Sequence, residues 1–241
     1  METVLTEDAL LGGRVRILQS RRGYRVAVDA VLLAASVHPA PGERVLDLGA
    51  GVGAVGLCLA TRVPDCTVVG IELQPALAEA ARRNVVRNGF GERMQMIVHD
   101  LAQPLPAELG LFEQVVSNPP YLAAAVADPP PDPSKALATV ESSADLRRWL
   151  EVAVGALKPG GTLTLIHRSD RLEEIAAHLV RLGCGTLTIK RLPPAARVLV
   201  RARRTQSPSI TEAAPLTLHP PEGGYTEAAE AILRHAAALD F

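Results

Sequence analysis

The chain has 241 residues, 48% of them apolar and 3% aromatic, so its length fits one α/β domain packed mainly by aliphatic side chains and alanine. No apolar run approaches the roughly 20 residues that span a bilayer, and the acidic start, Met1 to Asp8, lacks a secretory pattern, so we expect a cytoplasmic protein. With a net charge of −1, three cysteines outside any CxxC spacing and six scattered histidines, the sequence predicts neither a disulfide framework nor a metal site.

The N-terminal part predicts a small extension before a regular alternation of elements. Residues 14–28 form two short β runs around Ser20 to Gly23, which predicts a hairpin, and residues 29–37 predict a helix with Asp29 as its N-cap. Strands are then expected over residues 44–48, 67–71, 94–98, 114–117, 162–167, 187–191 and 197–202. Helices are expected over residues 53–62, 75–88, 143–157, 171–182 and 226–239, and loops over 122–141 and 205–223.

This alternation predicts a Rossmann-like α/β fold, with a mostly parallel seven-stranded sheet covered by helices on both faces. We expect a single domain over residues 1–241, in which residues 1–40 form the hairpin and helix extension and residues 41–241 form the core. The proline-rich segment 122–141 is long for a compact domain and directly follows the most specific motif of the chain, which favours a lid.

A glycine-rich turn follows the first core strand, in the form Asp47-x-Gly49-x-Gly51-x-Gly53. Glycines let the backbone adopt positive φ and pass close to a ligand, and ligands of such sheets bind at the carboxyl ends of the strands. The overlapping GxGxxG pattern, with Glu72 about twenty residues later, also fits a dinucleotide site. A carboxylate at Asp47 would repel a pyrophosphate, but it suits the cationic methionine moiety of S-adenosylmethionine.

Two further acids end the next two strands. Glu72 follows Val69-Gly70-Ile71 and is placed to accept hydrogen bonds from a ribose diol. Asp100 follows Ile97-Val98-His99 and is placed to accept one from the amino group of the cofactor's adenine. Acids at three successive strand ends indicate S-adenosylmethionine as the cofactor, with S-adenosylhomocysteine as the product.

The sequence Asn118-Pro119-Pro120-Tyr121 follows the fourth core strand and is the most specific feature of the chain. An amide-like or aromatic amino nitrogen is a poor nucleophile because its lone pair is delocalised. The Asn118 side-chain oxygen and the Pro119 carbonyl can accept its two N–H groups, which orients the nitrogen toward a methyl donor. Tyr121 can stack on the planar acceptor, and the prolines stiffen the segment.

These motifs resemble those of class I methyltransferases, and the whole chain resembles the bacterial valine-tRNA adenine-N(6) methyltransferase family. The discriminating matches are the segments at 6–13 (TEDALLGG), 23–34 (GYRVAVDAVLLA), 157–161 (LKPGG), 215–219 (PLTLH) and 224–228 (GYTEA). The resemblance implies methyl transfer to the 6-amino nitrogen of a tRNA adenine beside the anticodon. It also implies that Asp47, Gly49, Gly51, Gly53, Glu72, Asp100 and Asn118 hold the cofactor, that Asn118 to Tyr121 hold the base, and that Tyr24, Arg25 and Asp29 lie over the cofactor pocket.

The arginines are unevenly distributed, which bears on the partner. Residues 12–25 hold five arginines and residues 181–204 hold seven basic residues, with no acid in either segment. These basic residues either form a phosphate-binding face or are ordinary solvent-exposed side chains with no role in binding. On the first interpretation the protein binds RNA, most simply a tRNA, through Arg21, Arg22, Arg201, Arg203 and Arg204.

Other functions stay open on the sequence. A release-factor glutamine methyltransferase uses the same Asn-Pro-Pro-Tyr chemistry, but that family carries a helical substrate domain before the cofactor motif, and here only 46 residues precede Asp47. A methyltransferase acting on a guanine 2-amino group in rRNA is a further alternative. From other classes, a nicotinamide-dependent oxidoreductase fits the GxGxxG overlap, and a non-catalytic binding module is also compatible with the fold.

Overall fold

The computed structural model describes residues 5–21, 25–121 and 143–241. The described strands are β1 (Leu5–Leu10), β2 (Val15–Ser20), β3 (Arg44–Leu48), β4 (Thr67–Glu72), β5 (Met94–Val98), β6 (Phe112–Ser117), β7 (Leu157–Arg168), β8 (Cys184–Arg191), β9 (Arg197–Arg203) and β10 (Thr205–Ala213). The described α-helices are α1 (Val28–Ala35), α2 (Ala54–Arg62), α3 (Pro75–Arg87), α5 (Leu146–Gly155), α6 (Leu172–Arg181) and α7 (Glu227–His235).

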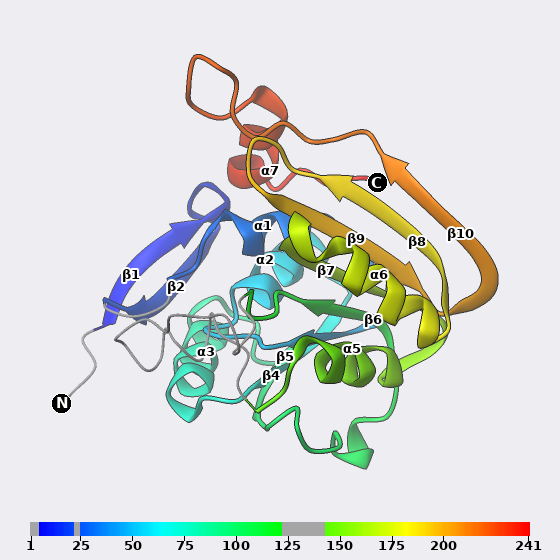
Figure 1. Ribbon diagram of the computed structural model, residues 1–241. Coiled ribbons are helices and arrows are strands. Elements are labelled where there is room, and N and C mark those ends of the chain that lie inside the picture. The colour runs from blue at the N-terminus through cyan, green and yellow to red at the C-terminus, as the bar shows by residue number, and fades with distance from the viewer. Residues whose placement is uncertain (1–4, 22–24, 122–142) are drawn as a thin grey trace.

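The large sheet has the strand order β10-β8-β9-β7-β6-β3-β4-β5 (Figure 1). Strand β9 runs antiparallel to β7 and β8, and the other neighbouring pairs are parallel. The chain moves outward from β3 to β4 and β5 on one side, and from β6 to β7 on the other. Loops at the carboxyl ends of β3 and β6 therefore diverge, and the crevice between them is where ligands of such sheets bind.

Helices cover both faces of this sheet and enclose two apolar cores (Figure 1). Helices α1, α2, α3 and α7 share one core, which contains Leu32, Leu57 and Ile232. Helices α5 and α6 share the other, which contains Leu150 and Ile175. Three of the five residues of the central strand β3 are buried and apolar, as expected for a strand covered on both faces. The expected Rossmann-like α/β fold is confirmed.

A two-stranded hairpin, β1–β2, packs beside this core, but its turn lies earlier than the sequence predicts. We expected strands on either side of Ser20 to Gly23; the antiparallel partner of β2 is instead Leu5–Leu10, and the turn falls at Leu11–Gly13. Three of the six residues of β1 are polar and adjacent, which concealed a strand that is only partly buried. Side-chain amides of α3 fix the hairpin: Asn84 bonds the backbone N–H and C=O of Leu18, at 2.7 and 2.9 Å.

Two further expectations are corrected. The sheet has eight strands, because residues 205–213, expected as a loop, form β10 at the sheet edge and pair with β8. A polar, exposed segment that contains Pro208 is tolerated only at an edge, which explains why its pattern resembles a loop. Asp29 lies in the first turn of α1 rather than at its N-cap, which is Ala27.

The expected lid, residues 122–141, lies outside the described residues. Among the residues that the structure describes, no helix has both the length and the apolar character needed to cross a bilayer.

Candidate active site

A pocket opens at the carboxyl edge of the sheet, at the divergence of β3 and β6. Its walls come from the turn after β3, the ends of β4 and β5, residues 118–121 after β6, and Trp149 of α5, with Val26 and Ala30 on the side of the hairpin and α1. The sequence motifs therefore meet at one place. The fold brings together Gly49, Gly51, Glu72, Asp100 and residues 118–121, as the sequence predicts.

The glycine turn adopts the backbone conformations that its residue types allow. Gly49, Gly51 and Gly53 all have positive φ, at 74°, 56° and 86°. Gly49 and Gly51 line the pocket, whereas Gly53 is the left-handed N-cap of α2 and is absent from the pocket wall. A Cβ on Gly53 would lie 3.4 Å from Ala81 and Met94, so this glycine serves the turn and the packing of α2.

Asp47 lies below the glycine turn and not on the pocket wall. Its side chain is 1% exposed, and its Oδ2 atom is buried without a hydrogen-bond partner among the described residues. Burial raises the pKa of this carboxyl to about 7, although a hydrogen bond from the Gly56 backbone opposes the shift. A buried carboxylate without a partner favours a nearby cation. That Asp47 helps to bind a cationic donor, directly or through the glycine turn, stays a prediction.

Glu72 connects the end of β4 to the glycine turn and lines the pocket. Its Oε2 accepts the N–H of Gly51 at 2.8 Å, and its Oε1 accepts the N–H of Gln74 at 2.8 Å. Burial nevertheless raises the pKa of its carboxyl. A dinucleotide site needs the N–H groups of such a turn to bind the pyrophosphate. Here the Gly51 N–H already donates to the Glu72 carboxylate. This arrangement disfavours the nicotinamide-dependent alternative.

Asp100 lines the pocket after the end of β5. Its Oδ1 accepts the N–H of Ala102 at 2.9 Å and the hydroxyl of Ser143 at 2.7 Å. These hydrogen bonds lower the pKa of the carboxyl, so it is ionised at neutral pH. Leu73 and Leu101 supply apolar walls nearby. A planar group with one hydrogen-bond donor, such as an adenine, fits this part of the pocket.

Trp149 is a pocket residue that the sequence analysis missed. Its indole N–H donates to Ser117 Oγ at 2.7 Å, and that hydroxyl donates to the Leu48 carbonyl at 2.9 Å, so the ring is fixed to β6 and β3. A Cβ on Gly49 would come within 2.8 Å of the ring, which explains why glycine is needed there. Trp149 is the single tryptophan of the chain and lies after the Asn118 motif in the sequence. These two facts are the sequence signal that could have identified it as a pocket residue.

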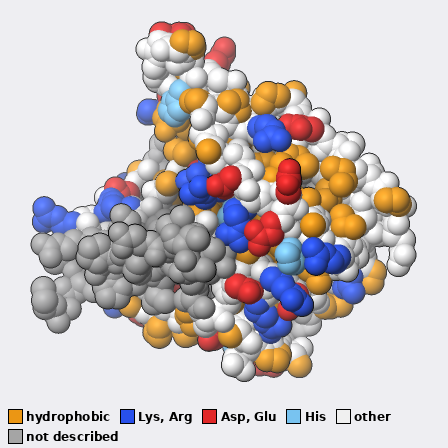
Figure 2. Space-filling model, viewed as in Figure 1, with side chains coloured by type: hydrophobic (Ala, Val, Ile, Leu, Met, Phe, Trp, Pro, Cys, Tyr) orange, Lys and Arg blue, Asp and Glu red, His pale blue; other side chains and the backbone are white. Residues whose placement is uncertain are grey.

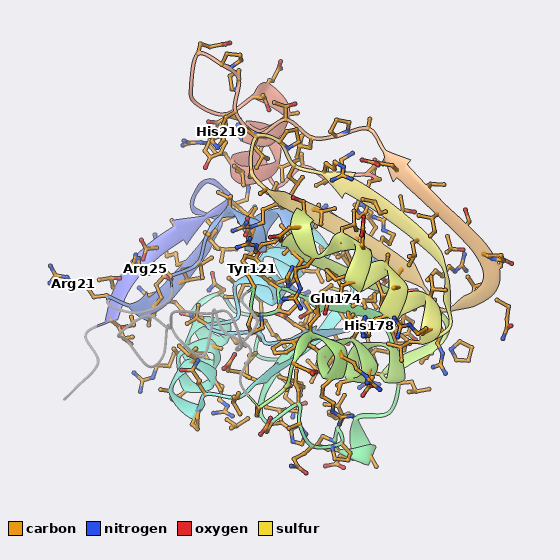
Figure 3. The ribbon with its side chains drawn as sticks, viewed as in Figure 1. Arg21, Arg25, Tyr121, Glu174, His178 and His219 are labelled. Atoms are coloured by element: carbon orange, nitrogen blue, oxygen red, sulfur yellow. The ribbon has the colours of Figure 1, made fainter. Side chains whose placement is uncertain are left out.

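Tyr121 lines the pocket, and side chains from distant segments surround it (Figure 3). Its hydroxyl lies 2.7 Å from both Asn118 Oδ1 and Asp29 Oδ2. The guanidinium of Arg197 lies 4.4 Å from the centroid of its ring. The same arginine donates from Nε to Asp29 Oδ2 at 3.1 Å. Asp29, which the resemblance placed over the cofactor, thus contacts Tyr121 of the Asn118-Pro119-Pro120-Tyr121 motif. Arg197 joins the same cluster, although the sequence did not single it out.

His167 of β7 meets the edge of the Tyr121 ring, at 5.1 Å between centroids and an interplanar angle of 67°. The imidazole is fully buried, and burial lowers its pKa to about 4, so the ring is neutral at physiological pH. Sequence reasoning did not single out this histidine, because nothing in its strand pattern separates it from an ordinary core residue.

Arg25 belongs to the segment between β2 and α1, and its side chain lies against the hairpin, away from the pocket wall (Figure 3). Its guanidinium donates to Asp8 Oδ2 at 2.6 Å, to Thr6 Oγ1 at 2.9 Å and to the Ser20 carbonyl at 3.1 Å. It therefore holds the hairpin to the segment that leads into α1. Tyr24 and Arg22 lie outside the described residues.

The other arginines expected to bind RNA fall in two places. Arg21 is exposed where β2 ends, on the same side of the molecule as Arg25 (Figure 3). Arg201 donates to the Phe241 carbonyl and to the Ser36 carbonyl, which ties the C-terminus to α1. Arg203 and Arg204 donate to the Gly160 and Leu157 carbonyls at the amino edge of the sheet, opposite the pocket. An RNA contact by any of them stays a prediction.

Charged side chains of both signs mix on the face that carries α5 and α6 (Figure 2). Arg147 pairs with Glu151 at 3.1 Å, and Arg171 pairs with Glu174 at 2.6 Å. Such partly exposed pairs contribute little to stability, and they leave this face without an excess of one sign. In the described part of the chain, no group of three side chains has the arrangement of a metal site; that the enzyme needs no metal stays a prediction.

The buried, unpartnered oxygen of Asp47, the close-approach glycines, and the acids at two strand ends fit a donor with a cationic head, a ribose and an adenine. Together with the sheet topology, this pocket defines a Rossmann-like, S-adenosylmethionine-dependent methyltransferase.

Comparisons with known proteins agree with this class. The family model "methyltransferase small domain" matches residues 24–181. A tRNA1(Val) (adenine(37)-N6)-methyltransferase of Porphyromonas gingivalis is 31% identical over 227 residues, which cover 88% of each chain. The enzyme of the same name from Aeromonas hydrophila is 32% identical over 215 residues, covering 86% of this chain and 87% of that one. The chain therefore belongs to the methyltransferase small domain family and to the family of these tRNA1(Val) (adenine(37)-N6)-methyltransferases.

Solved structures give the same fold. A predicted O-methyltransferase from Agrobacterium tumefaciens superposes with a TM-score of 0.67 at 27% identity, covering 88% of this chain and 99% of that chain. The mitomycin 7-O-methyltransferase superposes with a TM-score of 0.52 at 20% identity and covers 74% of this chain, which shows a shared fold alone.

Proposed function

We propose that this protein transfers a methyl group from S-adenosylmethionine to the 6-amino nitrogen of an adenine in a tRNA. The relatives' names supply the substrate, the valine tRNA and its adenine 37. The observation that carries the proposal within this chain is the position of Asn118 and Tyr121 on the wall of the donor pocket. An amide acceptor and an aromatic ring at that place suit a planar amine.

The protein's contribution is to bind and orient the two reactants. Asn118 Oδ1 and the Pro119 carbonyl accept the two N–H groups of the target, which holds its nitrogen in line with the methyl group. S-adenosylmethionine supplies an electrophilic methyl group on a sulfonium. The nitrogen lone pair forms the new N–C bond as the S–C bond breaks, and the product nitrogen then loses a proton to water. Because the proton leaves after attack, the site needs no strong base.

RNA suits this pocket for a physical reason. An anticodon loop is single-stranded, so its bases can be unstacked and inserted into a pocket at modest cost. The Arg197 guanidinium covers one face of the Tyr121 ring, at 4.4 Å, and we expect the target adenine to stack on the opposite face. We expect Arg21, which is exposed directly after β2, to meet a backbone phosphate.

The alternatives receive less support. A release-factor glutamine methyltransferase would share the Asn118 motif, but no relative among those compared above is named for a protein substrate. None of the relatives compared above is named for methylating a guanine. The named relatives and the Asn118 motif favour adenine.

The test combines the purified protein, labelled S-adenosylmethionine and total RNA that lacks the modification, followed by mass spectrometry of nucleosides. We expect N6-methyladenosine in the tRNA fraction. Asn118→Ala should lower the rate by about 100-fold or more, as the loss of one positioned polar group does in other enzymes. Gln206→Ala, which removes an exposed carboxamide from β10 outside the pocket, is the control and should keep the rate. Transfer to a protein glutamine, with none to RNA, would overturn the proposal.

A further inference from the structure

Asn118 meets a chain of polar side chains that begins far from the catalytic motif. Arg197 of β9 donates to Asp29 of α1 at 3.1 Å, and that carboxylate oxygen lies 2.7 Å from the Tyr121 hydroxyl. The same hydroxyl lies 2.7 Å from Asn118 Oδ1. Asp29 and Arg197 are 168 residues apart in sequence, and neither lines the pocket, so they reach the reaction only through Tyr121.

The Tyr121 hydroxyl has one proton and two oxygens at the same short distance, so it can donate to only one of them. The Asp29 side chain is 13% exposed and is paired with Arg197, which keeps a charged acceptor in place. A hydrogen bond to a carboxylate is about twice as strong as one to a neutral amide. The proton therefore goes to Asp29.

A second consequence concerns the Asn118 amide. Two oxygens 2.7 Å apart with no proton between them repel, and a half-turn of the amide replaces Oδ1 by Nδ2 beside Tyr121. The amide N–H then donates to the Tyr121 oxygen, which still has a lone pair to accept it. This rotation leaves the amide oxygen, the atom that the target amine needs, without a competing donor from Tyr121.

We propose that Asp29 and Arg197 are positioning residues that fix the Asn118 side-chain amide through the Tyr121 hydroxyl, so that its oxygen is held for the target amine. Arg197 acts twice, because it bonds the carboxylate and also lies over the tyrosine ring at 4.4 Å. His167 supports the ring from its edge. The inference rests on the proposed function only in assigning the amine as the group that Asn118 receives.

The proposal predicts an unusual double-mutant cycle. In Asp29→Ala, Asn118 Oδ1 is the one of the two oxygens that stays beside the Tyr121 hydroxyl. The hydroxyl then donates to Oδ1 and competes with the target amine for it, so we expect kcat to fall about tenfold. In Tyr121→Phe the hydroxyl is absent, so the Asn118 amide loses its orienting contact but its oxygen is not blocked. We expect kcat to fall about threefold. The double variant should match Tyr121→Phe, so removing the hydroxyl rescues Asp29→Ala. Glu230→Ala, which removes an ion-paired carboxylate from the first turn of α7, is the matched control.

Binding measurements separate positioning from damage to the fold. Trp149 is the single tryptophan and lines the donor pocket, so its emission reports donor binding. We expect Asp29→Ala to keep the dissociation constant for S-adenosylhomocysteine within about twofold. A merely structural Asp29 would give a weaker donor complex, and its loss would add to that of Tyr121→Phe rather than being suppressed by it; either result overturns the proposal.

A readout without catalysis tests the amide itself. The chain has three asparagines, so selective 15N labelling gives three side-chain amide groups, and Asn118→Ala assigns the relevant one. We expect one Asn118 amide proton to be shifted and protected from exchange, and to lose both properties in Tyr121→Phe and in Asp29→Ala. Unchanged Asn118 signals in both variants would contradict the proposal. If these signals change but no RNA is methylated by the wild type, the proposed function fails while the positioning inference stands.

Discussion

The half of the pocket proposed to hold the donor, the donor half, and the half proposed to hold the target, the target half, are assembled in different ways. The donor half uses three successive strand ends, β3, β4 and β5, and its polar groups bond the backbone next to them, as Glu72 bonds Gly51 and Gln74. The target half joins α1, the segment after β6, β7 and β9 through side-chain contacts centred on Tyr121. Substitutions in the donor half should therefore act locally, whereas those in the target half should act jointly.

The largest effect on donor binding is expected at Glu72. Replacing it by alanine leaves the N–H groups of Gly51 and Gln74 without their charged acceptor, and each such bond contributes about 1.5–3 kcal/mol. Partial rescue by water leaves a loss of about 100-fold in the affinity for S-adenosylhomocysteine, measured by calorimetry or Trp149 emission. Glu79→Ala, on the exposed side of α3, is the control. An unchanged affinity in Glu72→Ala would show that the strand-end carboxylate is dispensable.

A smaller effect distinguishes two glycines of the same turn. Gly49→Ala places a Cβ 2.8 Å from the Trp149 ring at a φ of 74°, so strain and overlap together should cost about 2–4 kcal/mol. Gly51→Ala has a φ of 56° and meets no described atom within 4 Å, so only the backbone cost of about 1–2 kcal/mol applies. Thermal unfolding should rank Gly49→Ala as the less stable variant, with an altered Trp149 emission. Equal melting temperatures would contradict the close contact.

The two halves should also respond to pH with opposite signs. The pKa of Asp47 is raised from 3.8 to about 7, so the folded state binds its proton more tightly than the unfolded chain does. The contribution of Asp47 to stability is therefore lost as the pH rises from about 4 to about 7. Asp47→Asn removes this loss, and its melting temperature should gain several degrees on the wild type across that interval.

His167 shows the reverse. Its pKa is lowered from 6.5 to about 4, so the folded state binds the proton less tightly than the unfolded chain, and stability is lost as the pH falls from about 6.5 toward 4. The wild type should lose several degrees relative to His167→Phe over this interval. Melting temperatures recorded from pH 4.5 to 8 check both residues. Differences that do not vary with pH would contradict the assigned burial of these groups.

The smallest expected effects concern RNA affinity. Arg21→Ala, which removes an exposed arginine directly after β2, should weaken tRNA binding severalfold. If Arg21 contacts one phosphate, the slope of log affinity against log salt should fall by about 0.7–0.9. Arg203→Ala, whose guanidinium bonds the Gly160 carbonyl at the opposite edge, should leave the slope unchanged. Titrations at several salt concentrations compare the two. If the slope changes only in Arg203→Ala, the RNA-binding surface lies at the amino edge of the sheet instead.

The donor half could be predicted from sequence because each of its acids follows its own strand. The positions of Gly49, Gly51, Glu72 and Asp100 all follow from local strand-turn patterns, and the structure brings them to one pocket. The core strands and helices follow from the same periodicity, and the structure places them within a few residues of the expected bounds, except at β7, where the strand starts at Leu157.

The rest depends on contacts between distant segments, which a single sequence does not encode in a local pattern. Arg197 appeared as one basic residue among several, and Asp29 as a helix start, until α1 and β9 were packed against Tyr121. The strands β1 and β10 carry several polar residues and are at least partly exposed, so pairing with a neighbour, rather than an apolar pattern, makes them strands. Trp149 likewise becomes a site residue only because α5 packs over Gly49.

The most direct test of the central claim uses two tRNA1(Val) transcripts, one with adenine at position 37 and one with guanine there. Labelled methyl transfer by the purified protein is measured on each, and the product nucleoside is identified by mass spectrometry. The account predicts N6-methyladenosine from the adenine transcript and no transfer to the guanine transcript. Equal transfer to both transcripts, or a methylated guanine in the second, would contradict it.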